Sequence, residues 1–240
     1  MKAMVLAAGA GSRLRPLTDH CPKPMVPIGG QPLLVHVLRL LAKHGFTDLV
    51  INLHHLPEVI EGHLGDGALW GVRITYSYEP VLLGTAGALR PVAAFFDEPF
   101  LVYYGDNLAN FDLGALWSHH RAASVPATLG LLPMDEPTTR GIVGLDGRGR
   151  VNRMIEKPRP EQVFADYLVN AGTYILDPSV FQFIAPSGTC DFASQVFPAM
   201  LAGAVPLAGH RLRGDLLSTD THARYRQAEA AVASGAFALP

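Results

Sequence analysis

Residues 2–16 read K-A-M-V-L-A-A-G-A-G-S-R-L-R-P, a short apolar strand followed directly by a loop of small residues. Small residues allow backbone N–H groups to approach an anion closely, so consecutive amides of this loop can surround phosphate oxygens. A dinucleotide fingerprint would need a third glycine where Leu14 stands, and a P-loop would need Gly-Lys-Ser/Thr at its end. The stretch therefore predicts a phosphate-binding turn of another kind after the first strand of an α/β fold.

Two cations accompany this loop. Arg13 lies within it, and Lys23 follows in the tripeptide P-K-P. Transfer of a phosphoryl or nucleotidyl group concentrates negative charge on phosphate oxygens and on the leaving group, so fixed cations nearby lower the barrier. Arg can bind such a group through two nitrogens, whereas Lys acts as a point charge. The alternative is that both are surface side chains beside an ordinary tight turn.

Strand-like and helix-like segments alternate through the first half of the chain. Apolar residues recur at helical spacing over 32–44, and Gly45 is placed to end that helix. Similar patterns predict strands at 2–6, 48–52, 73–78 and 100–104, and helices at 57–64, 85–92 and 113–121. This order predicts an α/β fold with a mainly parallel central sheet, covered by helices on both faces.

The second half is less regular. Residues 142–145 and 151–155 read as two strands joined by D-G-R-G, a strong hairpin signal. Further strands are predicted at 127–132 and 168–176, and helices at 178–184, 192–202 and 222–233. Because no linker rich in Ser or Gly and no repeat separates the halves, we expect a single domain over 1–240, with halves at 1–125 and 126–240.

The composition limits the classes of partner. A net charge of -2 gives no basic surface for nucleic acid or for an anionic membrane, and no apolar stretch is long enough to span a bilayer. The N-terminal apolar run is too short and too rich in glycine for a signal peptide. Cys21 and Cys190 lie far apart without metal-ligand spacing. We therefore expect a cytoplasmic protein that binds small molecules and neither nucleic acid nor membrane, as a monomer or a homo-oligomer.

Several motifs occur in an order that resembles the sugar-1-phosphate nucleotidylyltransferases. The opening L-A-A-G-A-G-S-R-L-R-P-L-T is followed by C-P-K-P-M-V-P-I, G-T-A-G-A-L, G-D-N, R-G-I-V, E-K-P and N-A-G. The resemblance covers nearly the whole chain. It implies a glycosyltransferase-A-like, Rossmann-like fold with a mixed, mainly parallel sheet and without the β-helix extension of some members. It also implies that 1–125 is the nucleotide-binding half and 126–240 the sugar-phosphate-binding half.

The resemblance implies a role for residues in each motif. Arg13, Lys23, Asp106 and Lys157 correspond to catalytic positions, and Asp106 would hold Mg²⁺ at the end of a parallel strand, where ligands of α/β sheets bind. The nucleotide would contact Asp106 and the following residues of two loops: Leu6, Ala7, Ala8, Gly9, Gly11, Ser12, Gly84, Thr85 and Gly87. The sugar phosphate would contact Asn107, Gly141, Glu156, Lys157, Asn170 and Gly172. Glu79 is a weaker candidate for a ribose or sugar contact.

One segment departs from the family pattern. Related sequences carry a second metal-binding Asp near the C-terminus, and the alignment on Thr221 and Tyr225 puts Ser218 at that position. Either Asp220 serves as the metal ligand through a shifted backbone, or Asp106, phosphates and water hold Mg²⁺ alone, or catalysis is weakened.

The resemblance implies transfer of a nucleotidyl group from an NTP to a sugar 1-phosphate, with release of pyrophosphate. G-T-A-G resembles guanylyltransferases for mannose or heptose 1-phosphate and short uridylyltransferases, so GTP is expected first and UTP or dTTP second. Transfer from CTP to phosphocholine is disfavoured by the sugar-side motifs. A non-catalytic NDP-sugar sensor remains an alternative because of Ser218, whereas Leu14 argues against an NAD-dependent oxidoreductase.

Overall fold

The computed structural model describes residues 1–9 and 11–240, and the chain divides into two compact units. Unit 1 comprises Met1–Leu82, Tyr103–Asp112 and Arg213–Pro240, and unit 2 comprises Leu83–Val102 and Leu113–Leu212. The chain passes from unit 2 into unit 1 within strand β6 (Phe100–Tyr104). Each unit is therefore assembled from segments that are distant in sequence.

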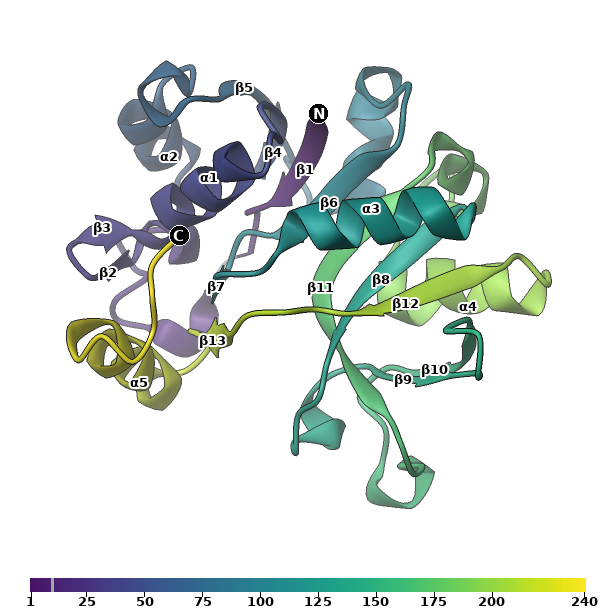
Figure 1. Ribbon diagram of the computed structural model, residues 1–240. Coiled ribbons are helices and arrows are strands. Elements are labelled where there is room, and N and C mark those ends of the chain that lie inside the picture. Colours follow the sequence, from purple (N-terminus) through teal and green to yellow (C-terminus); the bar gives the residue numbers. More distant parts are fainter. Residues whose placement is uncertain (10) are drawn as a thin grey trace. The chain divides into compact units, whose positions relative to one another are not determined.

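Unit 1 is built on parallel strands. β4 (Asp48–Leu53) lies between β1 (Lys2–Leu6) and β5 (Arg73–Tyr78), as Figure 1 shows. The strands are short apolar runs, buried except at their ends and on the outer face of β5, which explains their parallel pairing inside the unit. The helices are α1 (Leu33–Lys43), α2 (Pro57–Leu64) and α5 (His222–Ala233), with short 3-10 helices at Ser12–Leu14, Lys23–Met25 and Ala68–Trp70.

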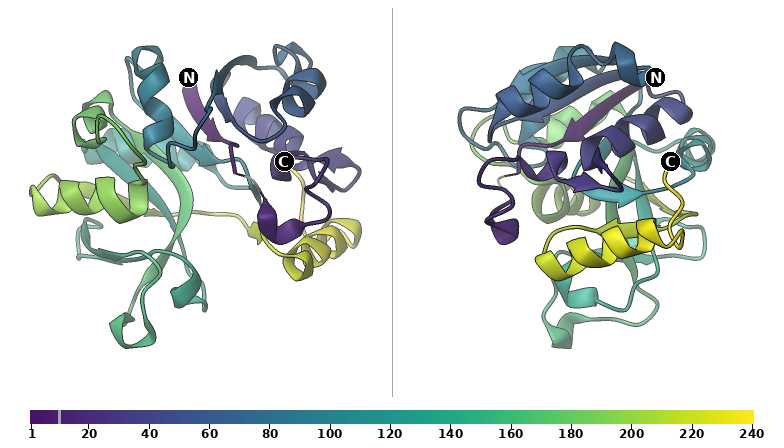
Figure 2. Two further views of the ribbon diagram at one scale, coloured as in Figure 1. Left: turned by 180° about the vertical axis from the view of Figure 1, so that it is seen from behind. Right: turned by 90° about the vertical axis from the view of Figure 1, so that its left-hand side faces the viewer.

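Two small antiparallel pairs complete unit 1. β2 (Pro27–Ile28) pairs with β3 (Gln31–Pro32), and β7 (Asn107–Ala109) pairs with β13 (Leu216–Ser218). The C-terminal helix α5, yellow in Figure 2, belongs to the same apolar cluster as these strands. That cluster contains Ile28, Leu33, Leu108, Ala228 and Phe237. The last part of the chain thus packs on segments near its beginning.

Unit 2 holds a mixed sheet (Figure 1). β8 (Ala127–Leu132) pairs in parallel with β12 (Leu207–Arg211) and antiparallel with β11 (Leu168–Leu176). β9 (Ile142–Leu145) pairs antiparallel with β11 and with β10 (Val151–Ile155). The helical segments are α3 (Leu113–Ala123), α4 (Phe197–Ala202), 3-10 helices at Gly87–Phe95, Pro137–Thr139, Pro160–Gln162 and Pro178–Phe183, and a π-helical turn at Phe192–Val196.

The observed elements differ from the predicted ones in several places. The helix expected at 85–92 is a 3-10 helix with Pro91 inside it, and Val92 leaves helical geometry because proline removes a donor and crowds the preceding turn. The segment 192–202 begins with a π-helical turn before α4. β12 was not predicted because L-A-G-H-R lacks the β-branched residues typical of strands. A Cβ at its Gly209 would lie 2.5 Å from Leu145 Cδ2, so the leucine side chain would have to move to accept a larger residue there.

The predicted fold class is confirmed: the protein is α/β, with a mixed, mainly parallel sheet and flanking helices. None of the helices in the described part of the chain has the length and apolar character needed to cross a membrane.

Candidate functional site

The candidate phosphate loop, residues 6–16, starts where β1 ends. Gly11 has a φ of 61°, a left-handed conformation that glycine adopts without strain. A Cβ at Gly11 would lie 2.8 Å from Lys23 Cβ and 3.0 Å from Thr18 Cγ2. The Thr18 hydroxyl donates to the Gly11 carbonyl at 2.9 Å. Glycine therefore lets the loop pack directly on the segment that carries Lys23. Ala10 lies outside the described residues.

A buried polar chain anchors the start of this loop. The Ala7 N–H donates to Asn52 Oδ1 at 2.8 Å, and Asn52 Nδ2 donates to Glu79 Oε1 at 2.7 Å. Asn52 and Glu79 are only 4% and 1% exposed. Buried polar groups are stable only when they are hydrogen-bonded, so these contacts fix the loop to the ends of β4 and β5. Glu79 is therefore an internal support of the phosphate loop.

Lys23 and Asp106 form an ion pair beside the loop. Lys23 Nζ lies 2.6 Å from Asp106 Oδ2, with exposed side-chain fractions of 8% and 40%. The Gly105 N–H donates to the Leu6 carbonyl at 2.9 Å, which ties the end of β6 to the end of β1. The cation is thus nearly buried, whereas its carboxylate partner remains open to solvent and to a ligand.

Arg13 forms a second ion pair, with Asp220. Its Nη1 lies 2.8 Å from Asp220 Oδ2, while Ser218 Oγ and Arg224 Nη1 donate to Oδ1 at 3.0 and 3.2 Å. Burial acts to raise the pKa of Asp220, but the hydrogen bonds from Arg224 and Ser218 and the charges of Arg224 and Arg13 outweigh it, so the pKa is lowered. Asp220 is therefore held as a carboxylate.

In unit 2, the loop at 83–87 packs on the backbone of Cys190. The N–H groups of Ala86 and Gly87 both donate to the Cys190 carbonyl at 3.0 Å. Thr85 Oγ1 donates to Asp191 Oδ2 at 2.6 Å. Gly84 has a φ of 81°, and a Cβ there would lie 2.4 Å from the Cys190 oxygen. The G-T-A-G motif thus forms a rigid turn whose two later amides bind the protein itself.

A second group in unit 2 gathers Gly141, Glu156 and Asn170. A Cβ on Gly141 would lie 2.6 Å from Glu156 Oε2, and the Asn170 N–H donates to the Gly141 carbonyl at 2.9 Å. Asn170 Oδ1 accepts from the Gly172 N–H at 3.0 Å, and its Nδ2 donates to the Tyr174 hydroxyl at 2.8 Å. Glycine at 141 therefore makes room for the Glu156 carboxylate beside a fixed asparagine.

Burial raises the pKa of Glu156, which the charge of Lys157 partly offsets. Lys157 itself is exposed and has a φ of 45°, which is uncommon for a residue with a side chain. The two neighbours in E-K-P therefore differ in surroundings, one partly buried and the other in solvent.

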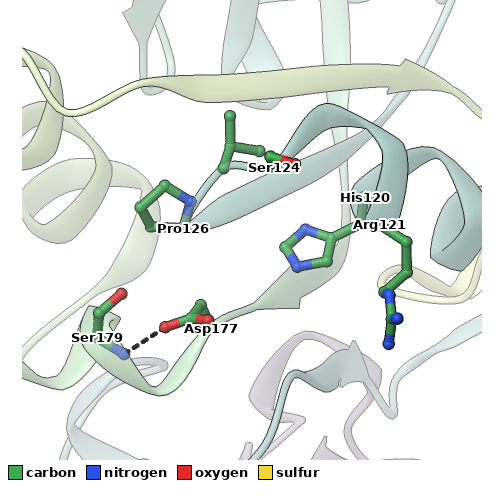
Figure 3. Close-up of a pocket in the computed structure, with 7 residues that line it drawn as sticks. His120, Arg121, Ser124, Pro126, Asp177 and Ser179 are labelled. Atoms are coloured by element: carbon green, nitrogen blue, oxygen red, sulfur yellow. Dashed lines mark hydrogen bonds between the residues drawn. The ribbon is translucent and has the colours of Figure 1, made fainter.

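Unit 2 also has a surface pocket, lined by residues of 120–126 and 177–179. Figure 3 shows the His120 ring, on α3, facing the space toward Asp177, whose carboxylate accepts from the Ser179 N–H at 2.9 Å. The other lining residues are Arg121, Ser124, Val125 and Pro126. None of the residues expected from the motifs lines this pocket.

Comparison with known proteins identifies the family. The family model described as "Nucleotidyl transferase" matches residues 2–215. The chain belongs to the nucleotidyl transferase family. It is 36% identical over 220 residues to the UTP–glucose-1-phosphate uridylyltransferase of Synechocystis sp., covering 86% of this chain and 56% of the relative. It is also 36% identical to the mannose-1-phosphate guanylyltransferase of Mycobacterium tuberculosis, covering 83% of this chain and 55% of that relative. The chain thus spans a little over half the length of these curated relatives.

Two solved structures share the fold. A putative glucose-1-phosphate thymidylyltransferase from Bacillus anthracis, in complex with a sucrose, superimposes with a TM-score of 0.85 at 27% identity, covering 96% of this chain and 94% of that one. HddC from Yersinia pseudotuberculosis, complexed with GMP-PN, superimposes with a TM-score of 0.80 at 21% identity, covering 96% of this chain and 99% of that one. Sequence motifs and structure therefore lead to the same family.

The family resemblance implies a bound Mg²⁺, and the carboxylates of Asp106 and Asp220 differ in how well they suit it. Mg²⁺ needs oxygen ligands but keeps several waters and often takes only one or two carboxylates. Asp106 fits, because no hydrogen bond within the described residues engages its Oδ1. Asp220 would have to give up Arg13 and Arg224 to bind a metal. Residues 1–9 and 11–240 contain no group of three or more His, Cys, Asp or Glu side chains that could hold a metal ion.

The sequence motifs did not indicate three residues that hold motif loops in place, one in unit 1 and two in unit 2. Asn52 holds Ala7, and Cys190 and Asp191 hold the G-T-A-G turn. Asn52 could have been noticed as a polar residue inside the apolar run D-L-V-I-N-L. Cys190 acts through its backbone, which leaves no sequence signal.

Replacing Asn52 by leucine should loosen the phosphate loop. The change removes the acceptor for the Ala7 N–H and one donor to the buried Glu79 carboxylate, so the free energy of unfolding should fall by about 2–4 kcal/mol. Thermal unfolding measures this loss, and nucleotide titration should show weaker binding. Unchanged stability and affinity would show that Asn52 does not anchor the loop.

Proposed function

We propose that this protein transfers a nucleotidyl group from an NTP to a sugar 1-phosphate, giving an NDP-sugar and pyrophosphate. The observation that carries the proposal is the Lys23–Asp106 pair beside the phosphate loop: a nearly buried ammonium 2.6 Å from a half-exposed carboxylate. A fixed cation suits the charge of a departing pyrophosphate, and an accessible carboxylate suits a metal ion shared by phosphates.

In this mechanism an oxygen of the sugar 1-phosphate attacks the α-phosphorus of the NTP, and the bond to the β,γ-pyrophosphate breaks. Arg13 and Lys23 stabilise the charge on the pyrophosphate as it leaves. The nucleophile is already an anion, so no general base is required, and catalysis depends on placement and charge stabilisation. A Cβ at Gly9 would meet nothing within 4 Å, so this position of the loop faces open space.

Mg²⁺ bound at Asp106 would neutralise charge on the α-phosphate and the attacking oxygen. On the sugar side, Lys157 is proposed to meet the 1-phosphate and Glu156 to accept hydrogen bonds from sugar hydroxyls. The proposal also assigns sugar contacts to Asn107, Gly141, Asn170 and Gly172, and nucleotide contacts to residues 6–9 and to Gly11, Ser12, Gly84, Thr85 and Gly87.

We infer GTP with a mannose- or heptose-like 1-phosphate as the first substrate pair to test, and UTP or dTTP with glucose 1-phosphate as the second. The relatives named above include a mannose-1-phosphate guanylyltransferase and a glucose-1-phosphate uridylyltransferase at the same 36% identity, so identity alone does not choose between them. We also propose a cytoplasmic location, which suits an enzyme that uses NTPs and two unpaired cysteines, Cys21 and Cys190.

The test is a matrix of GTP, UTP, dTTP, CTP and ATP against mannose, heptose and glucose 1-phosphates with Mg²⁺. Pyrophosphate release is followed enzymatically, and the NDP-sugar is identified by mass spectrometry. At least one pair should give both products. Omission of the sugar phosphate is the control, because release without it would indicate simple NTP hydrolysis.

A non-catalytic NDP-sugar sensor is the second candidate. It is favoured by Ser218 at the position of the second metal-binding Asp and by the ion pairs that already occupy both Asp220 oxygens. Binding of nucleotide or NDP-sugar with no turnover across the whole matrix would support the sensor and contradict the enzyme.

A further inference from the structure

The C-terminal segment 218–224 contacts the phosphate loop at two points. Asp220 pairs with the Arg13 side chain at 2.8 Å, and His222 Nε2 lies 2.7 Å from the Arg15 carbonyl. The loop and the segment are more than 200 residues apart in sequence, yet both belong to unit 1. A side-chain contact and a backbone contact together define where the loop lies relative to the start of α5.

Asp220 is a rigid partner in this arrangement. Its side chain is 18% exposed, and Ser218 and Arg224 bind its Oδ1 at 3.0 and 3.2 Å. Thr221 caps α5 by accepting from the Arg224 N–H at 3.3 Å, which fixes the backbone next to Asp220. The carboxylate therefore stays in place whether or not Arg13 binds it.

Arg13 has little else to hold it. Its side chain is 69% exposed, and Nη1 is the guanidinium atom in its ion pair with Asp220. Among the described residues no other hydrogen bond engages that guanidinium. A guanidinium carries five N–H donors, so one edge can stay on a carboxylate while another binds a phosphate oxygen.

We propose that Asp220 is a positioning residue that holds the Arg13 guanidinium at the phosphate loop for the departing pyrophosphate. Asp220 has two cationic partners, Arg13 and Arg224, so this group retains a net positive charge for an anion. Both Asp220 oxygens are already used, which separates this role from metal binding. The inference rests on the proposed function, because it gives Asp220 a task in that reaction.

The test is a double-mutant cycle with Asp220→Asn and Arg13→Ala, read by calorimetric titration with inorganic pyrophosphate and by kcat for the active substrate pair. Each single variant should weaken pyrophosphate binding about five- to tenfold, and the double variant should bind no more weakly than Arg13→Ala alone. Asp220→Glu keeps the charge and should retain more affinity than Asp220→Asn. The matched control is Asp19→Asn, which removes the partner of Arg15 on the same loop and should leave affinity unchanged.

Additive losses, or tighter pyrophosphate binding by Asp220→Asn, would overturn the proposal. So would unchanged pyrophosphate affinity with a several-fold rise in the Mg²⁺ concentration for half-maximal activity, which would mark Asp220 as a metal ligand. Thermal unfolding checks that the variants fold.

The binding measurements do not require catalysis, so they separate the positioning role from the proposed function. If the wild-type protein binds pyrophosphate and the variants show the expected affinities, but no substrate pair gives product, the proposed function is refuted and the positioning role of Asp220 stands. Failure of the wild type to bind pyrophosphate would refute the positioning role.

Discussion

Replacing Lys23 by alanine is expected to lower kcat about 100-fold or more, with a smaller change in KM for the NTP. The Lys23 ammonium has a side-chain exposure of 8%, so water screens its charge poorly, and no other lysine of the described chain lies on this loop segment. A cation that acts on the pyrophosphate contributes most when the bond to the α-phosphorus breaks. Steady-state kinetics on the active substrate pair measures the split between kcat and KM.

The fold should survive this change. Asp106, the carboxylate left without Lys23, is 40% exposed and can be solvated, so the lost ion pair leaves no deeply buried charge. Lys43→Ala is the matched control, since Lys43 is exposed at the end of α1 and outside the proposed site. A Lys23→Ala protein with wild-type kcat would remove Lys23 from the mechanism, whereas loss of kcat together with unfolding would indicate a structural role.

The sequence predicted the regular elements well because periodicity and turn chemistry are local. β1, β5, β6, β8, β10 and β11 have the predicted bounds, and D-G-R-G forms the expected hairpin turn, with Asp146 accepting from the Arg148 and Arg150 N–H groups. β12 shows the limit of this reasoning. Its composition is poor for a strand, and it is defined by its parallel pairing with β8, a contact between distant segments.

The sequence motifs predicted which residues belong to the candidate site, but not which of their side chains contact one another. Motifs indicated Arg13, Lys23 and Asp106, but no motif predicts that Asp106 lies opposite Lys23 or Asp220 opposite Arg13. Such pairs depend on which loops meet after folding. The contacts that the motif residues are proposed to make with ligands stay predictions. Supporting residues such as Asn52 can be identified only from the buried hydrogen bonds of the structure.

Replacing Gly84 by alanine should lower the free energy of unfolding by about 3 kcal/mol, and Tm by roughly 6–12 °C. Two costs combine. The φ of 81° is strained for any residue with a Cβ, and that Cβ would lie 2.4 Å from the Cys190 oxygen. Backbone atoms cannot swing aside as a side chain can, and the same oxygen accepts from the Ala86 and Gly87 N–H groups at 3.0 Å. Differential scanning calorimetry measures the loss.

Substitutions at two other glycines distinguish the cost of the backbone conformation from the cost of the clash with Cys190. Gly30 has a φ of 80°, and a Cβ added there would meet nothing within 4 Å, so Gly30→Ala should carry the conformational cost alone, about 1 kcal/mol. Gly62 lies inside α2 with open space around it, and Gly62→Ala should raise stability by up to about 1 kcal/mol. If Gly84→Ala costs no more than Gly30→Ala, the G-T-A-G turn is free to move away from Cys190. A larger cost would show that packing on the Cys190 backbone, rather than ligand contact alone, requires glycine at this position of the motif.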